Sequence, residues 1–338
     1  MVQIILIGIA AGFAAALLFA SVVSGSFLSI LLFYLAPLPV MIAALGWSHL
    51  SGLIAAVVAA LGLAVAFGGF LFAAFLVGVG LPAWWLSYLA MLSRPVDPAS
   101  PDHREWYPIG RLVVWCAILG MLVVAMAIPN FGFDADSFRT GLKQAFERIV
   151  RIETSRADGN FPIDLDFLVL VIPPMAATLS TITNSGNLWL AARVVNVSGL
   201  LRRPWPDISA MKFPTYAPAI LAAALALTFA PLFGSLIGKS FSGPANYAPS
   251  LINIMAGVLA ASMLMAYALL GFAVIHALTR WMSNRTLILT GLYIGFLLTG
   301  VAFPGWPMLL MALVGLLDTV LDLRGRMARH HGPPATGT

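Results

Sequence analysis

The side chains of this sequence that could do chemistry are a few amides and one histidine inside apolar segments. Asn184 and Asn187 are three residues apart, so they share one face if a helix runs through them. Each amide has hydrogen-bond donors and an acceptor that lipid would leave unpaired. The two amides therefore either bridge neighbouring helices or point into a polar cavity that could bind a small molecule.

His276 and Asn253 lie in another apolar segment, residues 250–279. An imidazole can exchange a proton or bind a ligand near neutral pH, and it can equally join two helices through a hydrogen bond. We predict a ligand site formed by Asn184, Asn187 and His276, with Asn253 as a further candidate.

The sequence lacks the common signatures of catalysis. It has no His-Glu-x-x-His zinc motif, no Gly-x-x-x-x-Gly-Lys-Ser/Thr phosphate loop and no Gly-x-Ser-x-Gly elbow. Cys116, the only cysteine, lies in an apolar run, which argues against a disulfide framework or a thiolate metal cluster. We therefore expect no enzyme activity, no cofactor and no metal.

The composition sets the environment of these residues, because 61% of them are hydrophobic and 9% are charged. Soluble domains carry about 25% charged residues, so lipid must surround most of this chain. We predict an all-α polytopic bundle of about eight to ten spans. It would form one domain over residues 1–323, followed by a short, basic, disordered tail at 324–338. The apolar runs lie at 3–22, 27–46, 50–67, 69–92, 109–128, 163–183, 215–236, 250–279, 287–303 and 307–323.

Two proline pairs interrupt these runs. Pro37 and Pro39 lie in the second run, and Pro173 and Pro174 lie in the sixth, where we predict that they break or kink the helix. Backbone groups freed by a proline in lipid need new partners. A broken helix of this kind either packs inside the bundle or lines a cavity, as in many transporters.

The charged residues predict the orientation and one surface helix. Arginines recur at alternate connections, so ten crossings place those connections and both termini in the cytoplasm of a bacterial inner membrane. The net charge of +5 fits a lipid surface and indicates no nucleic-acid partner. Segment 134–153 has apolar residues at helical spacing, with Asp134 or Asp136 available as a cap. It is an amphipathic helix that lies on the outer membrane face or packs on the bundle.

Several local strings resemble the YybS-like predicted membrane proteins of bacteria, in the form typical of alphaproteobacteria. The resemblance implies a fold distantly similar to the substrate-binding subunits of energy-coupling-factor transporters, and it implies no established activity. Those subunits bind a partner through small residues of their first helices, and the Gly8–Ala20 run is compatible with this. The family often has a glutamine where this chain has Leu270. The strings are 38–47 (LPVMIAALGW), 105–111 (EWYPIGR), 187–193 (NLWLAAR), 203–207 (RPWPD) and 271–276 (GFAVIH).

These observations predict an integral inner-membrane protein that transports or binds a small molecule. The chain contains no nucleotide-binding domain that could supply energy. The alternative is a membrane scaffold or assembly factor that binds protein or lipid. It would use the surface helix at 134–153 and small-residue faces such as Gly8 and Gly12, whose spacing lets helices approach closely.

Overall fold

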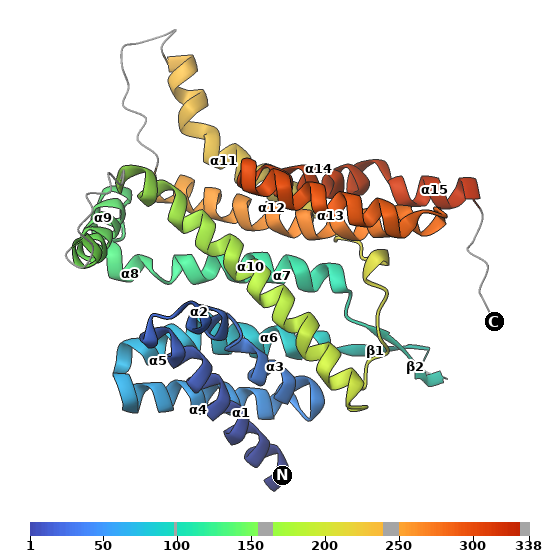
Figure 1. Cartoon of the computed structure of the whole chain (residues 1–338), viewed down its shortest axis with the longest axis horizontal. Helices are drawn as coiled ribbons and strands as arrows, with labels where there is room; N and C mark the ends of the chain where they lie inside the picture. Colours follow the sequence, from blue (N-terminus) through green and yellow to red (C-terminus); the bar gives the residue numbers. More distant parts are fainter. Residues whose placement is uncertain (98–99, 155–164, 239–249, 332–338) are drawn as a thin grey trace. The chain divides into compact units, whose positions relative to one another are not determined.

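The computed structural model describes residues 1–97, 100–154, 165–238 and 250–331. The fold is all-α apart from one hairpin, which confirms the predicted class (Figure 1). Seven helical segments of this described part are long and apolar enough to cross a membrane. Three shorter apolar helices lie at Ile109–Ala125, Ala217–Phe233 and Trp306–Leu321. Each apolar run of the sequence therefore corresponds to a helical segment.

The elements are named as in Figure 1, where η1, η3 and η4 are 3₁₀ turns and η2 is a π turn. In chain order they are α1 (Val2–Ala20), η1 (Ser21–Ser24), α2 (Phe27–Tyr34), α3 (Pro37–Gly46), α4 (His49–Phe67), α5 (Gly69–Phe75), η2 (Leu76–Gly80), α6 (Leu81–Ala90), β1 (Ser93–Asp97), β2 (Ser100–Trp106), α7 (Ile109–Ala125), α8 (Ile128–Phe131), α9 (Ala135–Thr154), α10 (Leu165–Val197), η3 (Ile208–Ala210), α11 (Ala217–Gly238), α12 (Leu251–Leu278), η4 (Thr279–Trp281), α13 (Arg285–Ala302), α14 (Trp306–Leu321) and α15 (Leu323–His331).

Contacts within the chain divide it into two compact units. Each unit is discontinuous in sequence, because α7, α10 and α12 each contribute residues to both. Unit 1 contains 1–116, 181–214 and 266–338, and unit 2 contains 117–180 and 215–265.

The N-terminal helices of unit 1 pack through small residues. On α1, Gly8 and Gly12 are buried against α4, and a Cβ atom at Gly12 would lie 2.8 Å from the Ala55 carbonyl oxygen. Only glycine allows the two backbones to approach so closely. The predicted small-residue face of α1 is therefore covered within the chain itself, while Ala10 and Ala14 are exposed.

The two proline pairs behave differently. The predicted break at Pro37 is confirmed, because α2 ends at Tyr34 and α3 begins at Pro37. Pro173 and Pro174 lie inside α10, which continues through both, so of the predicted break or kink only the break is absent. A proline removes only its own N–H group. Leaving the helix would expose many more backbone groups to lipid, so the helix continues.

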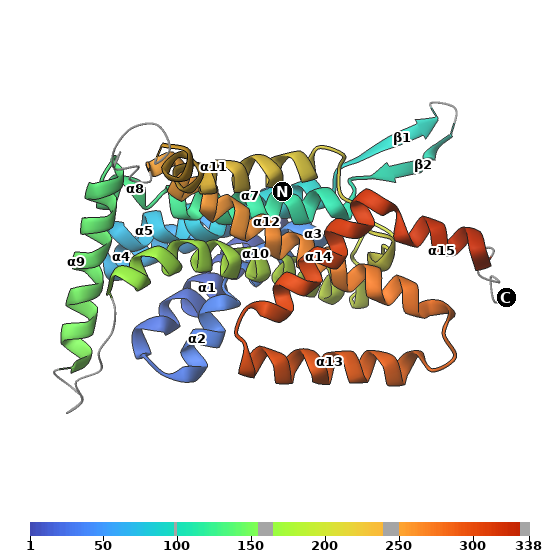
Figure 2. The same ribbon diagram turned by 90° about the horizontal axis from the view of Figure 1, so that it is seen from above.

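The C-terminal helices of unit 1 also pack closely through glycine. A Cβ atom at Gly271 of α12 would overlap the Met311 carbonyl group of α14, and Gly315 faces the Tyr267 carbonyl group in the same way. Figure 2 shows α13 following α12 through one turn and leading into α14 through another. None of the residues of α13 is buried within the described part of the chain.

Two elements of unit 1 differ from the sequence prediction. Strands β1 and β2 form an antiparallel hairpin that the sequence did not predict, and Arg94 pairs with Glu105 across it at 2.7 Å. The tail predicted to be disordered from residue 324 is instead helical as far as His331, in α15. Residues 332–338 of that predicted tail lie outside the described residues.

Unit 2 contains the predicted amphipathic helix. Helix α9 covers almost the predicted range, and Oδ1 of Asp134 caps it by accepting hydrogen bonds from the backbone N–H groups of Asp136 (3.1 Å) and Ser137 (2.9 Å). A hydrogen bond from the Ser137 side chain, followed by the one from its backbone N–H group, lowers the pKa of Asp134. Phe138 and Leu142 are buried in the unit 2 core, so α9 packs on the helices of this unit. The other core residues are Val124, Ala177, Met255 and Val258.

Candidate functional site

The two amides of α10 share a buried face, as predicted. Asn184 and Asn187 are 3% and 5% exposed, and Thr181, one turn before Asn184, is fully buried. Ala191 and Val195 continue the same stripe toward the end of the helix. The spacing of three or four residues keeps all five side chains on one side of α10. The polar part of this stripe therefore faces protein and not lipid.

Asn187 donates a hydrogen bond to the backbone at the helix break before Pro37. Its Nδ2 atom donates a hydrogen bond to the Tyr34 carbonyl oxygen at 2.8 Å and another to the Thr183 carbonyl oxygen, also at 2.8 Å. Around the break the backbone bonds join residues three apart, as from Ala36 N–H to the Phe33 carbonyl. In that pattern the Tyr34 carbonyl oxygen would accept a hydrogen bond from the N–H group of residue 37. This residue is proline, which has no N–H group. The Asn187 amide supplies the missing donor.

Asn253 in unit 2 likewise donates to a backbone carbonyl group near a proline. Its Nδ2 atom donates to the Leu227 carbonyl oxygen at 2.6 Å. In an ideal helix that carbonyl would accept from residue 231, which is Pro231, inside α11. Oδ1 of Asn253 accepts from Ser250 N–H at 2.8 Å, which caps the start of α12. Both ends of this amide are therefore engaged in holding helices.

His276 joins two helices of unit 1. Its Nε2 atom lies 2.7 Å from the hydroxyl oxygen of Tyr293 on α13. Phe272, one turn earlier on α12, stacks on the Tyr293 ring with centroids 6.0 Å apart. Asn184, Asn187 and His276 belong to unit 1 and Asn253 to unit 2. None of the four lines the cavity described next, so the structure does not gather them around it.

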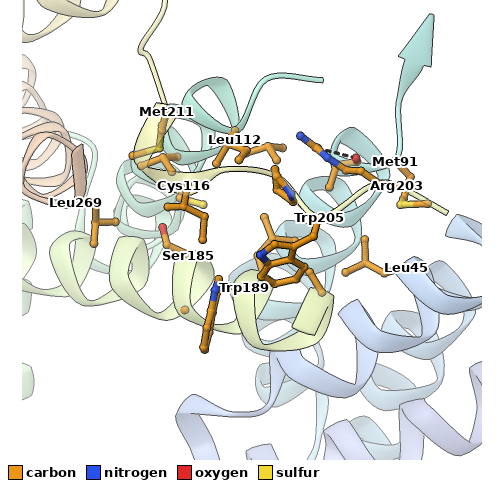
Figure 3. Close-up of a pocket in the computed structure, with 18 of the residues that line it drawn as sticks. Leu45, Met91, Leu112, Cys116, Ser185, Trp189, Arg203, Trp205, Met211 and Leu269 are labelled. Carbon is orange, nitrogen blue, oxygen red and sulfur yellow. Dashed lines mark hydrogen bonds between the residues drawn. The ribbon is translucent and has the colours of Figure 1, made fainter. Parts of the chain in front are cut away.

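Unit 1 contains an apolar cavity of about 360 Å³ that the sequence did not predict (Figure 3). Its walls come from the start of α7, the second half of α10 and the chain that follows α10. Leu112 and Cys116 line it from α7, and Ser185 and Trp189 from α10. Ser185 and Cys116 provide small polar groups on a mostly apolar wall (Figure 3).

The loop that closes the cavity is positioned by the end of α10. Gly199 adopts a left-handed conformation (φ +70°), and Leu200 N–H donates to the Val195 carbonyl oxygen at 3.0 Å. This is the Schellman arrangement, which ends a helix and turns the chain back along it. Arg203 and Trp205 then lie against the cavity, with prolines on either side of Trp205 that restrict the backbone.

Positive charge gathers at this loop. Nη1 of Arg203 donates to the Ala90 carbonyl oxygen at the end of α6, 3.0 Å away, and burial lowers the pKa of the half-buried guanidinium. The guanidinium carbon of Arg193 lies 5.3 Å from the centre of the Trp205 ring, a cation–π contact. The carboxylate of Asp207 pairs with Arg280 at 2.6 Å, which lowers the pKa of Asp207.

A buried ion pair contacts the end of this loop. Asp318, which is 5% exposed, accepts from Nη2 of Arg324 at 2.6 Å, and Nη1 of Arg324 donates to the Ser209 carbonyl oxygen at 2.7 Å. These contacts tie the loop after α10 to the end of α14. In the ranges that the structure describes, no group of three His, Cys, Asp or Glu side chains could hold a metal ion.

Comparisons of this chain with models of protein families, with curated proteins and with solved structures found no match. The site is therefore interpreted from its own geometry. Sequence reasoning found the polar residues that hold helices and missed the cavity. The one signal for the cavity was the Arg-Pro-Trp-Pro string at 203–206, which places a cation and an aromatic ring beside apolar runs.

Proposed function

We propose that this chain is a multi-pass protein of a bacterial inner membrane that binds an apolar small molecule in the cavity of unit 1, as a transport-related or ligand-binding subunit. The cavity carries this proposal. Its volume of about 360 Å³ lies in the range of ligand pockets, roughly 300–1,000 Å³. Its walls are apolar with a few polar groups, as ligand pockets typically are. The resemblance to YybS-like membrane proteins, and through them to substrate-binding transporter subunits, is in line with this function.

The proposal changes the roles of the predicted site residues. Asn187 and Asn253 serve carbonyl groups that prolines leave without a donor, and His276 joins α12 to α13. These three side chains then hold the helices, and the ligand contacts fall to the cavity lining, such as Trp189 and Trp205.

A substitution that fills the cavity tests the proposal. Gly186 lines the cavity, and a Cβ atom there would meet no atom within 4 Å, so Gly186→Leu adds volume without a backbone clash. A photoactivatable dodecanol would be added to the protein in phosphatidylcholine nanodiscs, and labelled residues would be mapped by mass spectrometry. We expect saturable labelling of the 182–192 peptide. The labelling should weaken about tenfold in Gly186→Leu, which corresponds to about 1.4 kcal/mol of lost contact.

Gly295→Leu is the matched control, because Gly295 lies on α13 and a Cβ atom there also meets open space. This variant should label like the wild type. Labelling of 182–192 that does not saturate, or that is equal in Gly186→Leu and the wild type, would contradict the proposal.

The scaffold alternative receives less support from the geometry. The features that suggest it are used within the chain, because Gly8 and Gly12 pack against α4, and Phe138 and Leu142 of α9 lie in the unit 2 core. A stoichiometric protein partner, found by crosslinking and retained in Gly186→Leu, would favour this alternative.

A further inference from the structure

The charged side chain that lines the cavity is Arg203. Its guanidinium has five donor N–H groups, and one of them is used by the Ala90 carbonyl oxygen. A carbonyl oxygen is neutral, so it pairs a donor without compensating the charge. In the part of the chain that the structure describes, no carboxylate forms an ion pair with Arg203. A half-buried cation without a counter-ion costs free energy that a bound anion would offset.

Among the residues that the structure describes, the loop that carries Arg203 adds positive charge, and its own acid is already paired. Arg193, near the end of α10, contacts the ring of Trp205, which also lines the cavity. Asp207, the nearest acid along the loop, is already paired with Arg280 at 2.6 Å. A cationic ligand would be repelled here, and a neutral one would leave the guanidinium charge uncompensated.

We infer that the cavity takes an anionic amphiphile, a single alkyl chain that ends in a carboxylate or phosphate head bound by Arg203. This inference rests on the proposed function and names its ligand class. An arginine fork binds either head group through two parallel hydrogen bonds. The alkyl chain packs against Leu112, Trp189 and Leu269. In Figure 3, Arg203 and Leu269 lie on opposite sides of the lining, which gives the head and the tail separate ends.

Probes of equal chain length test the head group. Photoactivatable dodecanoate, dodecyl phosphate, dodecanol and dodecylamine would each be titrated against the wild type in phosphatidylcholine nanodiscs, whose bulk lipid carries no net negative charge. We expect the two anions to saturate labelling of the 182–192 peptide at about tenfold lower concentration than the alcohol, the ratio for about 1.4 kcal/mol. The amine should label least. This order is measured on the wild type, so it does not depend on the folding of a variant.

Two neighbouring arginines provide the matched pair of variants. Arg203→Gln should remove the preference for anions over the alcohol, whereas Arg202→Gln removes the same charge from an exposed neighbour and should preserve it. Competition by unlabelled lysophosphatidic acid, which has a single acyl chain, would assign the anionic head to a membrane lipid. Competition by free dodecanoate alone would assign it to a free acid, and both results agree with the inference.

The outcomes separate this inference from the proposed function. Equal saturable labelling by the acid and the alcohol would overturn the anionic head and leave the apolar ligand site intact. Labelling of 182–192 by none of the probes would overturn both. An equal loss in Arg203→Gln and Arg202→Gln would show general attraction by surface charge, which also overturns the role of Arg203.

Discussion

Replacement of Asn187 by alanine tests whether an amide compensates for the proline break between α2 and α3. The change leaves the Tyr34 carbonyl oxygen without the donor that now lies 2.8 Å away. A buried acceptor left unpaired costs about 1–3 kcal/mol. The second bond, to the Thr183 carbonyl, adds little to the cost because that group lies within the regular part of α10. We expect a loss of about 1–3 kcal/mol in the free energy of unfolding.

The decisive measurement is a double-mutant cycle with Pro37→Ala. Alanine at position 37 restores an N–H group that can donate to Tyr34, so Asn187→Ala should cost less in that background. We expect a coupling energy of about 1 kcal/mol, well above the error of such cycles. Because Pro37→Ala also changes the flexibility of the break, only the coupling is informative, and not the single-variant stability.

Cys116 provides the assay, since it is the only cysteine and is buried. A thiol-reactive dye added to the protein in detergent reacts with it when unit 1 unfolds, so the reaction yields unfolding curves for all four proteins of the cycle. Asn196→Ala, at a less buried amide of α10, controls for the loss of an amide. Additive effects of Asn187→Ala and Pro37→Ala, or equal costs for Asn187→Ala and Asn196→Ala, would refute the reasoning.

Three further predictions use the same unfolding measurement. Asn253→Ala should lower the free energy of unfolding by about 1–3 kcal/mol, because it leaves the Leu227 carbonyl oxygen of α11 without its donor. An unchanged midpoint of unfolding would contradict this. Gly271→Leu should prevent native packing because its side chain would overlap α14, whereas Gly291→Leu meets open space and should be neutral; similar midpoints would argue against the close contact. Arg280 lowers the pKa of Asp207, so their ion pair stabilises the folded state at neutral pH. This contribution should decrease once the pH falls below about 3.9, the pKa of an unperturbed aspartate, and vanish below the lowered pKa of the folded state. Both side chains are 45% exposed, so the effect is under about 1 kcal/mol. Asp207→Asn should abolish this pH-dependent contribution. The same dependence of stability on pH in the wild type and in Asp207→Asn would contradict the role of the ion pair.

The sequence predicted what depends on local chemistry. Apolar runs became helices, the break at Pro37 occurred, and Asp134 caps α9. It also predicted that Asn184 and Asn187 share one face of a helix, and both are buried. The partner of Asn187 could not be predicted, because Tyr34 lies 153 residues away in sequence and only the fold brings them together.

The failures have a related cause. The sequence left open whether Pro173 breaks or kinks its helix, because the outcome depends on what would satisfy the exposed backbone. The hairpin at 93–106 is rich in charge and proline, which is typical of a loop, and its strands exist through pairing with each other. A cavity is unfilled volume between side chains of distant segments, such as Leu45, Cys116 and Trp205, so no residue pattern encodes it directly.

The exposure of α13 has an evolutionary consequence. Apart from its contacts with Phe272 and His276, this helix presents apolar side chains such as Leu297 (68% exposed) and Val301 (79%) to its surroundings. Selection can then act on its average hydrophobicity and hardly on the identity of each residue. Among descendants of a common ancestor, Leu297 should drift freely among aliphatic types, while Gly271 stays fixed. Substitution rates should therefore rise and fall abruptly between adjacent helices of the same unit.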